Sequence, residues 1–287
     1  MIRILAPAKI NLSLQILGLR PDGYHEIRSI AQKISLFDRI TLKEETQPGI
    51  SLVCDQPDIP TDSGNLAWRA ASLLMETAGI SGKGVSIILE KHIPHGAGLG
   101  GGSSDAAAVL LGMSVLFGLS PHPDLLHEIS LRIGSDVPLF LGPSPSSIEG
   151  RGDLVKPSLL RVPAIFLVVY PGFPVSTHWA YSNFRLTKKT RNYTISSQKK
   201  VDWGGVSPDR WQDLLVNDLE TVVSGRHPEI ARCRESLVRL GAKASLMSGS
   251  GSAVFGLFEN PDTAQRALKG ILSEGWPFAA LAEPVFS

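Results

Sequence analysis

Apolar and polar residues alternate near the start of the chain, where Ile10, Leu12, Leu14 and Ile16 occupy every second position. A period of two is typical of a strand with one buried face, so the pattern predicts a strand over 9–19. The RPDG stretch that follows (20–23) predicts a turn. Further strands are predicted at 26–36, 39–44, 50–54, 84–90, 164–170, 243–247, 253–258 and 277–282.

Apolar residues recur every three to four positions over 65–78, as on one face of a helix. Further helices are predicted at 103–118, 123–133, from about 176 to 240, and at 261–273. The breaker-rich stretch GPSPSS (142–147) predicts a boundary between a domain over 1–150 and a second over 151–287. In that second half, strands alternate with helices and with one tight hairpin, which suggests a ferredoxin-like α+β sandwich.

The composition is that of a globular protein with an ample core, because 43% of the 287 residues are hydrophobic and 19% are charged. A net charge of +1 argues against a nucleic-acid partner. The longest apolar run, AIFLVVY (164–170), is too short to span a bilayer, and no signal peptide is visible. We therefore expect a cytoplasmic protein with no membrane partner. We also expect a monomer or weak homodimer, although composition does not determine the oligomeric state. The two cysteines, Cys54 and Cys233, lack metal-site spacing.

The most informative motif is PHGAGLGGGSSD (94–105), which leads directly into a helical pattern. Glycine lets backbone N–H groups converge, and a helix N-terminus adds partial positive charge, so the motif predicts a polyphosphate site. Ser103, Ser104 and Asp105 are also suitable N-cap residues, and a capped helix after a flexible loop is the plainer alternative. The predicted phosphate-binding residues are Pro94, His95, Gly96, Ala97, Gly98, Leu99, Gly100, Gly101, Gly102, Ser103 and Ser104.

Other phosphate-binding motifs do not fit this loop. A Walker A loop needs Lys after the last glycine, where Ser103 stands. Gly96, Gly98 and Gly101 match GxGxxG, but KHIPH separates them from the preceding strand, whereas a dinucleotide-binding loop opens directly from one. The motifs VAIK, HRD and DFG of protein kinases are absent.

The loop resembles the PxxxGLGSSAA motif of the small-molecule kinases named for galactokinase, homoserine kinase, mevalonate kinase and phosphomevalonate kinase. APAKINLSLQILGLRPDGYHEI (6–27) resembles the first motif of that family, and SLMSGSGSAVFGLF (245–258) resembles the third. The resemblance covers nearly the whole chain. It implies an α+β fold with a ribosomal-S5-domain-2-like N-terminal domain, which binds ATP, and a ferredoxin-like C-terminal domain, which contributes to the substrate site.

Four details of the sequence, PAKINL, GYHEI, GLGGGSSDAA and GSDVPLFL, point to one member of that family. The resemblance then implies an ATP-dependent phosphotransferase with an alcohol acceptor, in the non-mevalonate route to isoprenoid precursors. The acceptor that the resemblance implies is a sugar alcohol that carries a cytidine diphosphate group.

Asp136 and Lys9 are the candidate catalytic residues. Asp136 follows a small-residue turn and precedes what we expect to be an apolar strand, and from spacing alone it could equally be a turn or N-cap acid. Lys9 lies within a strand pattern and could simply extend its ammonium to solvent. The resemblance implies that Asp136 is the catalytic base and that Lys9 is its partner, which lowers the carboxylate pKa and stabilises a developing alkoxide.

The resemblance also implies an acceptor site. Asn11, which shares a strand face with Lys9, would line it. Tyr24 would stack on the cytosine ring and His25 would hydrogen-bond the base edge, although both could be ordinary residues beside a turn. A second aromatic from the predicted 176–184 helix would complete the stack, and Tyr181 and Phe184 are the two candidates.

The remaining candidates carry weaker signals. Gly249, Ser250 and Gly251 could form only a tight hairpin turn, but the resemblance implies that they approach the substrate phosphates and the acceptor. Asn65 and Lys91 are expected near the adenine. Mg²⁺ is expected to enter with ATP, with Ser103 or Ser104 as a possible hydroxyl ligand and Asp105 as the nearest acid. The basic stretch 187–200 is expected to be a solvated surface loop rather than an anion site.

Overall fold

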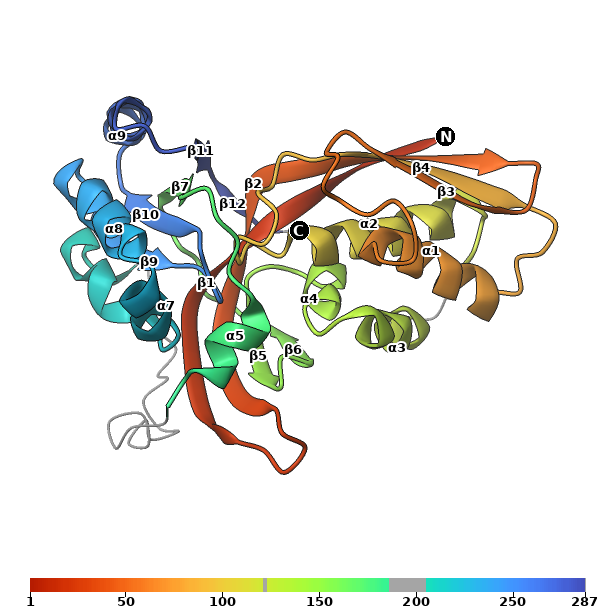
Figure 1. Ribbon diagram of the computed structural model, residues 1–287, viewed down its shortest axis with the longest axis horizontal. Coiled ribbons are helices and arrows are strands. Elements are labelled where there is room, and N and C mark those ends of the chain that lie inside the picture. The colour runs from red at the N-terminus through yellow and green to blue at the C-terminus, as the bar shows by residue number, and fades with distance from the viewer. Residues whose placement is uncertain (121–122, 186–204, 287) are drawn as a thin grey trace. The chain divides into compact units, whose positions relative to one another are not determined.

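The computed structural model describes residues 1–120, 123–185 and 205–286 (Figure 1). The predicted surface loop at 187–200 falls outside these residues. The described chain divides into unit 1, formed by Met1–Ala8, Phe37–Ile93 and Gly100–Pro143, and unit 2, formed by Lys9–Leu36, Pro94–Leu99 and Ser144–Ser287. The boundary at residue 150 stays a prediction.

Unit 1 combines strands with a group of helices. The C-terminal half of β2 (His25–Glu45) pairs antiparallel with β4 (Gly84–Glu90), and β3 (Gly49–Cys54) lies parallel to β4. The four helices of the unit pack on one another (Figure 1). They are α1 (Leu66–Thr77), α2 (Gly101–Leu116), α3 (Pro123–Ile133) and α4 (Val137–Leu141).

Helix α1 begins where its sequence pattern begins. Asn65 is the N-cap, and its side-chain oxygen accepts a hydrogen bond from Ala67 N at 2.9 Å. The helix ends before Gly79, whose φ of 64° no helical residue adopts. Its buried residues, Ala67, Ala70, Ala71 and Leu74, lie on one face, as the spacing of three to four positions requires.

Unit 2 contains a four-stranded antiparallel sheet in the order β11-β7-β10-β9. The strands are β7 (Ile165–Tyr170), β9 (Ala244–Met247), β10 (Val254–Phe258) and β11 (Phe278–Ala282). Helices α8 (Glu229–Arg239) and α9 (Pro261–Ser273) pack against them and against each other. The β-α-β-β-α-β order of these elements is that of a ferredoxin-like fold, so this prediction is confirmed.

The rest of unit 2 surrounds the N-terminal strands. The part of β1 (Ile2–Leu19) that belongs to unit 2 begins at Lys9. Within it, Ser13 and Leu14 pair parallel with the two residues of β8 (Val216–Asn217). The first half of β2 pairs with β5 (Ser146–Gly150), which pairs in turn with β6 (Leu154–Pro157). Two residues of β12 (Pro284–Val285) pair with Ile34 and Lys33 of β2. The helices here are α5 (Thr177–Ser182), α7 (Glu220–Arg226) and the 3₁₀ helix η3 (Pro208–Leu214).

Several predicted elements need correction. The strands expected at 26–36 and 39–44 are one strand, β2, which continues through Phe37 and Asp38. The apolar run VPLFL after Asp136 is helix α4 rather than a strand. A short buried run is compatible with either element, and proline within the first turn favours a helix. The predicted helical region 176–240 is interrupted by β8, and the short strands β5, β6 and β12 were not predicted.

Candidate active site

The glycine loop contains alternating backbone conformations. Gly98 and Gly100 adopt φ values of 78° and 74°, which residues with a Cβ rarely adopt, while Ala97 and Leu99 between them are 1% exposed. A Cβ on Gly98 would lie 2.3 Å from Ser248 O, so the loop also needs glycine for close approach to a second backbone. The alternation therefore buries the two apolar residues and leaves the glycines at the turns.

Helix α2 begins earlier than the sequence predicted. Its N-cap is Gly100, with no side-chain cap, so Ser103, Ser104 and Asp105 are residues of the helix and not its cap. The first amides of a helix have no acceptor within it, and those of Gly101, Gly102 and Ser103 are available to an anion on this ground. Ser104 Oγ is buried and has no hydrogen-bond partner among the described residues.

Three motifs that are far apart in the sequence meet in unit 2. Lys9, 5% exposed, donates through Nζ to Asn11 Oδ1, and Lys9 N donates to Leu99 O at 2.9 Å. A Cβ placed on Gly249 would lie 3.1 Å from Lys9 Nζ and 3.0 Å from Gly98 O. The lysine of β1, the glycine loop and the β9–β10 turn are therefore in direct proximity. The buried ammonium of Lys9 does not extend to solvent.

Hydrogen bonds hold the β9–β10 turn in this position. Ser248 Oγ donates to Gly98 O at 3.2 Å and accepts from Asn11 N at 3.3 Å. Ser250 Oγ and Thr177 Oγ1 are 3.0 Å apart. Asn217 Nδ2 donates to the carbonyls of Met247 and Gly249, both at 2.8 Å. Asn217 and Ser248 were not among the predicted site residues. Ser248 directly precedes the predicted turn at 249–251, and this position is the signal that could have found it, whereas Asn217 falls within a region predicted to be helical.

The predicted cytosine-binding residues gather around the start of β2 and around α5, which ends at Ser182, so Tyr181 lies on the helix and Phe184 just beyond it. The His25 ring centroid lies 5.4 Å from that of Tyr181 and 6.4 Å from that of Phe184. Burial lowers the pKa of His25, which favours a neutral imidazole that can both donate and accept. Tyr24 is 56% exposed, and the Arg151 guanidinium lies 5.4 Å from its ring centroid. Both candidates for the second aromatic thus lie near His25, with Tyr181 the closer.

Asp136 stands at the N-cap of α4 but makes no capping hydrogen bond. Across the described residues, its carboxylate has no hydrogen bond or ion pair. An acid that served only to cap the helix would bond its free amides. The carboxylate is therefore available for a ligand in unit 1.

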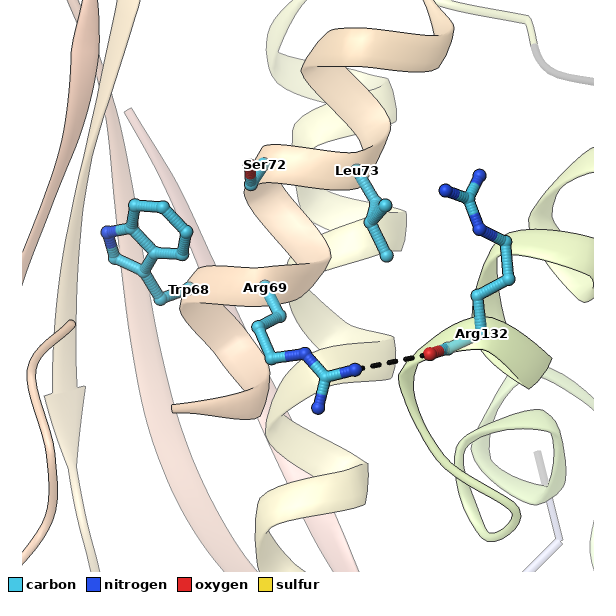
Figure 2. A pocket seen from close by; sticks show the side chains of 5 residues that line it. All are labelled: Trp68, Arg69, Ser72, Leu73 and Arg132. Atoms are coloured by element: carbon cyan, nitrogen blue, oxygen red, sulfur yellow. Dashed lines mark hydrogen bonds between the residues drawn. The ribbon is translucent and has the colours of Figure 1, made fainter. Parts of the chain in front are cut away.

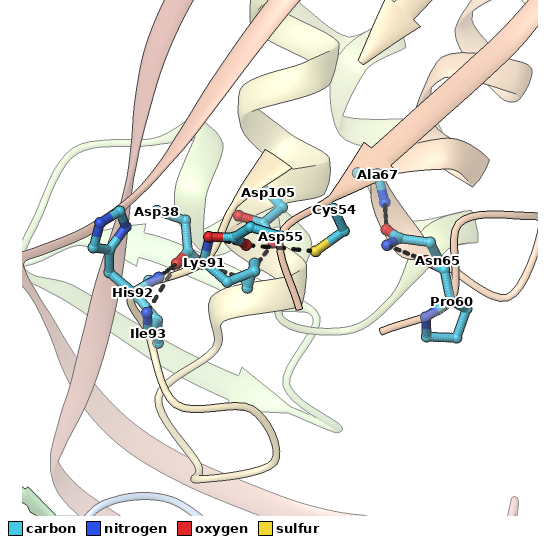
Figure 3. Close-up of polar contacts among 10 residues, drawn as sticks. All are labelled: Asp38, Cys54, Asp55, Pro60, Asn65, Ala67, Lys91, His92, Ile93 and Asp105. Atoms are coloured by element: carbon cyan, nitrogen blue, oxygen red, sulfur yellow. Dashed lines mark hydrogen bonds and ion pairs between the residues drawn. The ribbon is translucent and has the colours of Figure 1, made fainter. Parts of the chain in front are cut away.

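Asn65 and Lys91, expected near the adenine, are both engaged within unit 1 (Figure 3). The Asn65 amide caps α1 and also donates to Pro60 O at 2.8 Å. Lys91 Nζ forms ion pairs with Asp38 and, at 2.6 Å, with Asp105. Direct contact of either residue with adenine stays a prediction.

A hollow of about 310 Å³ lies on unit 1 between α1 and α3 (Figure 2). Its lining residues are Trp68, Arg69, Ser72, Leu73 and Arg132. None of the predicted site residues lines it.

The donor set of the loop fits a magnesium ion that arrives with a nucleotide. Within the described residues, no group of three or more His, Cys, Asp or Glu side chains could hold a metal ion. The unpartnered atoms Ser104 Oγ and Asp105 Oδ1 are oxygens, the ligand type that Mg²⁺ prefers. Mg²⁺ commonly keeps several waters and takes one or two protein ligands beside substrate phosphates, and this sparse set matches that pattern.

Over the same described ranges of the chain, no helix is long and apolar enough to cross a membrane.

Two family models match the chain. The N-terminal domain of GHMP kinases matches residues 65–142, which include Asn65, the glycine loop and Asp136. The C-terminal domain of GHMP kinases matches residues 207–277, which include the β9–β10 turn.

Individual relatives match over nearly the full length. A protein of Geobacter sp. (strain M21) called 4-diphosphocytidyl-2-C-methyl-D-erythritol kinase is 45% identical over 98% of both chains. A protein of the same name from Syntrophotalea carbinolica is 43% identical, again over 98% of both chains. A crystal structure of 4-(cytidine 5'-diphospho)-2C-methyl-D-erythritol kinase is similar with a TM-score of 0.82, at 36% identity over all of both chains. A mevalonate kinase structure at 14% identity shares the fold, with a TM-score of 0.77. The chain therefore belongs to the GHMP kinase family, among the relatives known as 4-diphosphocytidyl-2-C-methyl-D-erythritol kinases.

Proposed function

We propose that this protein transfers the γ-phosphoryl group of ATP to the 2-hydroxyl of 4-diphosphocytidyl-2-C-methyl-D-erythritol, a step towards isoprenoid precursors. The observation that carries the proposal is the meeting of Lys9, Asn11, Gly98 and Gly249 in unit 2, at residues of three separate motifs. The full-length similarity to relatives of that name supports the choice of acceptor. We further propose that the enzyme acts in the cytoplasm as a monomer or weak homodimer.

Nucleotide binding is assigned to the glycine loop. The free amides at the start of α2 would bind phosphate oxygens, which also benefit from the positive end of the helix dipole. The Ser103 or Ser104 hydroxyl would hold Mg²⁺, which neutralises charge on the transferring phosphoryl group when it is bound. The burial of Ser104 Oγ without a partner among the described residues supports this assignment.

Asp136 is assigned as general base. It accepts the proton of the acceptor hydroxyl while that oxygen forms its bond to the γ-phosphorus, and the bond from this phosphorus to the bridging oxygen of ADP breaks. Lys9, in unit 2, is assigned the stabilisation of negative charge on the acceptor oxygen, because a buried ammonium acts strongly where water is excluded. Asn11 orients Lys9 through the bond from Nζ to Oδ1.

Recognition of the cytidine end is assigned to residues around the start of β2 and around α5. Tyr24 would stack on the base, with Tyr181 or Phe184 on the other side. A neutral His25 would match the mixed donor and acceptor edge of cytosine. The turn residues Gly249, Ser250 and Gly251 would approach the phosphates of the acceptor.

The decisive experiment measures ADP release over a panel of alcohols. The panel contains the cytidylated substrate, 2-C-methyl-D-erythritol 4-phosphate, homoserine and mevalonate, with ³¹P NMR to detect the new phosphomonoester. We expect efficient turnover of the cytidylated compound alone. Equal turnover of bare methylerythritol phosphate would contradict the cytidine assignment, and preference for homoserine or mevalonate would indicate another small-alcohol kinase of the family.

A nucleotide-binding module without catalysis is the alternative from a different functional class. It predicts ATP binding with no phosphoryl transfer to any member of the panel. The buried Lys9 and the Asp136 carboxylate, which makes no capping bond, favour catalysis, since a binding module needs neither.

A further inference from the structure

A buried ion cluster in unit 1 lies beside the two ends of the glycine loop (Figure 3). We call Asp38, Lys91 and Asp105 the Lys91 cluster. Lys91 Nζ contacts Asp38 Oδ2 and Asp105 Oδ2, and all three side chains are at most 5% exposed. Lys91 precedes the loop and Asp105 follows it, while Asp38 comes from the middle of β2.

Asp38 fixes the entry to the loop. Its Oδ1 accepts hydrogen bonds from His92 N at 2.6 Å and Ile93 N at 2.8 Å. These are the two residues immediately before Pro94, where the loop begins. With the Lys91 ammonium on Oδ2, the carboxylate has three donors, which satisfies a fully buried charge.

Asp105 fixes the exit from the loop. It lies near the start of α2, whose first residue, Gly101, leaves little space for a side chain on this side. A Cβ there would lie 3.1 Å from Ile93 Cγ2 and 3.4 Å from Asp38 Oδ2. Entry and exit of the loop are therefore packed together and joined through one ammonium group.

The two carboxylates are not equivalent. Asp105 Oδ1 is buried without a partner among the described residues, whereas both oxygens of Asp38 are bonded. Burial is the first cause that raises the pKa of Asp105, and the nearby Lys91 ammonium opposes it. Asp38 is thus the fully bonded member, and it carries the link between Lys91 and the loop entry.

We propose that Asp38 is a positioning residue for ATP, which acts through Lys91 and the backbone of 92–93 to hold the two ends of the glycine loop at the spacing that polyphosphate binding requires. The inference rests on the assignment of the nucleotide to this loop. It gives the Lys91 ammonium a role that needs no contact with the nucleotide, because both carboxylates already engage it.

The test compares Asp38→Asn with Glu44→Gln. The side-chain oxygen of the substituted asparagine can still accept from the amides of residues 92 and 93, but its NH₂ group no longer pairs with an ammonium. Glu44 forms an exposed ion pair with Lys83 in the same unit at 2.6 Å and serves as the control. Isothermal titration with a non-hydrolysable ATP analogue measures affinity without an acceptor, so its outcome is independent of which alcohol the enzyme uses.

We expect Asp38→Asn to weaken binding of the ATP analogue by roughly 5- to 30-fold. This is the upper part of the range for mutations that act through a packed network. Cytidine diphosphate affinity should stay within about twofold, and Glu44→Gln should match the wild type in both titrations. Unchanged analogue affinity in folded Asp38→Asn would overturn the proposal. So would an equal loss for cytidine diphosphate.

Asp105→Leu provides a second variant in case Asp38→Asn does not fold. It is compared with the wild type in titrations without Mg²⁺, because Asp105 Oδ1 is one of the oxygens that fit the ion. It removes the half-satisfied carboxylate and detaches the helix start from Lys91, while an apolar residue of similar size fills the buried site. We expect a melting temperature at or above that of the wild type together with analogue binding weakened by roughly 3- to 10-fold, since the effect is again transmitted through packing. Wild-type analogue affinity in this variant would show that the cluster serves stability alone.

Discussion

At the scale of single residues, two catalytic candidates depart from the arrangement that is usual at their positions. Lys9 is 5% exposed and donates to Asn11, whereas a strand lysine without a role normally reaches solvent. Asp136 departs in another way, because an acid at a helix N-cap usually accepts hydrogen bonds from the first amides and Asp136 accepts none of them. Each departure from the usual arrangement marks a side chain that a ligand can use.

Asp136→Asn should leave affinity for the ATP analogue nearly unchanged and lower kcat about 10²- to 10⁴-fold, the usual contribution of a positioned general base. Glu128→Gln, an exposed change on α3 in the same unit, is the control and should keep wild-type turnover. Steady-state ADP release measures both. Turnover above roughly a third of wild type in Asp136→Asn would mean that the carboxylate is only a turn residue.

Tyr24→Ala should raise KM for the cytidylated acceptor by roughly 5- to 150-fold, because loss of one base stack costs about 1–3 kcal/mol. The effect belongs in KM, since the base lies far from the reacting hydroxyl and its contact is similar in ground and transition states. Tyr24→Phe keeps the ring and should behave as wild type. An unchanged acceptor KM in Tyr24→Ala would contradict the assignment.

Lys33 provides a test of pH dependence. It is 4% exposed, and burial lowers its pKa to about 8, so the unfolded chain binds more protons between that pH and the ordinary pKa of lysine. The free energy of unfolding should therefore increase as the pH rises from about 8 towards the ordinary pKa of lysine, and decrease again as the pH falls. The total change from Lys33 is at most about 3 kcal/mol.

Urea unfolding of the wild type and of Lys33→Met at pH 7 to 10 measures this contribution, and groups that titrate equally in both proteins cancel. We expect the wild type to gain free energy of unfolding relative to Lys33→Met as pH rises. A difference that stays constant over this range would show that the Lys33 pKa is the same in the folded and unfolded chain.

At the scale of elements, loops are positioned by the backbone of their neighbours. Ser248 and Ala253 on either side of the β9–β10 turn bond to Gly98 O and Ala97 O, so the hairpin and the glycine loop are braced against each other. Glycine at position 98 is needed both for its positive φ and for this approach.

Gly98→Ala should therefore lower kcat/KM at least about tenfold, because a Cβ 2.3 Å from Ser248 O forces the loop and the hairpin apart, and small misplacements near a reacting centre are costly. Gly118→Ala is a matched control. Its φ of 63° is equally strained, but a Cβ there has nothing within 4 Å. Both variants should lose about 1 kcal/mol of stability from the positive φ, and Gly98→Ala should lose more because of its close contacts. Similar kcat/KM values in the two would contradict the bracing argument.

At the scale of the whole molecule, the two ligands are assigned to different sets of residues. All predicted cytosine contacts (Tyr24, His25, Tyr181 and Phe184) belong to unit 2, while the start of α2 belongs to unit 1. Hydrogen exchange should therefore show that cytidine diphosphate protects peptides from 23–30 and 177–184 and leaves α1 and α2 unchanged. The ATP analogue should protect 94–104. Protection of α1 by cytidine diphosphate would contradict the assignment.

Much of the fold could be predicted from periodicity and breakers. Strands such as β7 and helices such as α1 and α9 have strong patterns with clear ends, and the order of elements in the second half already indicated the ferredoxin-like sheet. Short strands and helices could not be predicted from the sequence, because whether they form depends on the segment that lies beside them. Val216–Asn217 is a strand only because β1 lies beside it, and VPLFL after Asp136 fits a buried helix as well as a strand.

The sequence by itself determined the class of chemistry, because a glycine-rich stretch before a helix predicts phosphate binding from backbone geometry alone. It also supplied Lys9, Asp136 and the turn at 249–251 as candidates through their motifs. Only the tertiary structure decided which of these residues meet, since long-range contacts such as Gly98 with Ser248 depend on chain segments that are remote in sequence. It alone revealed Asp38 and Asn217, whose roles come from buried charge and backbone bonding, because isolated polar residues leave no periodic pattern in the chain.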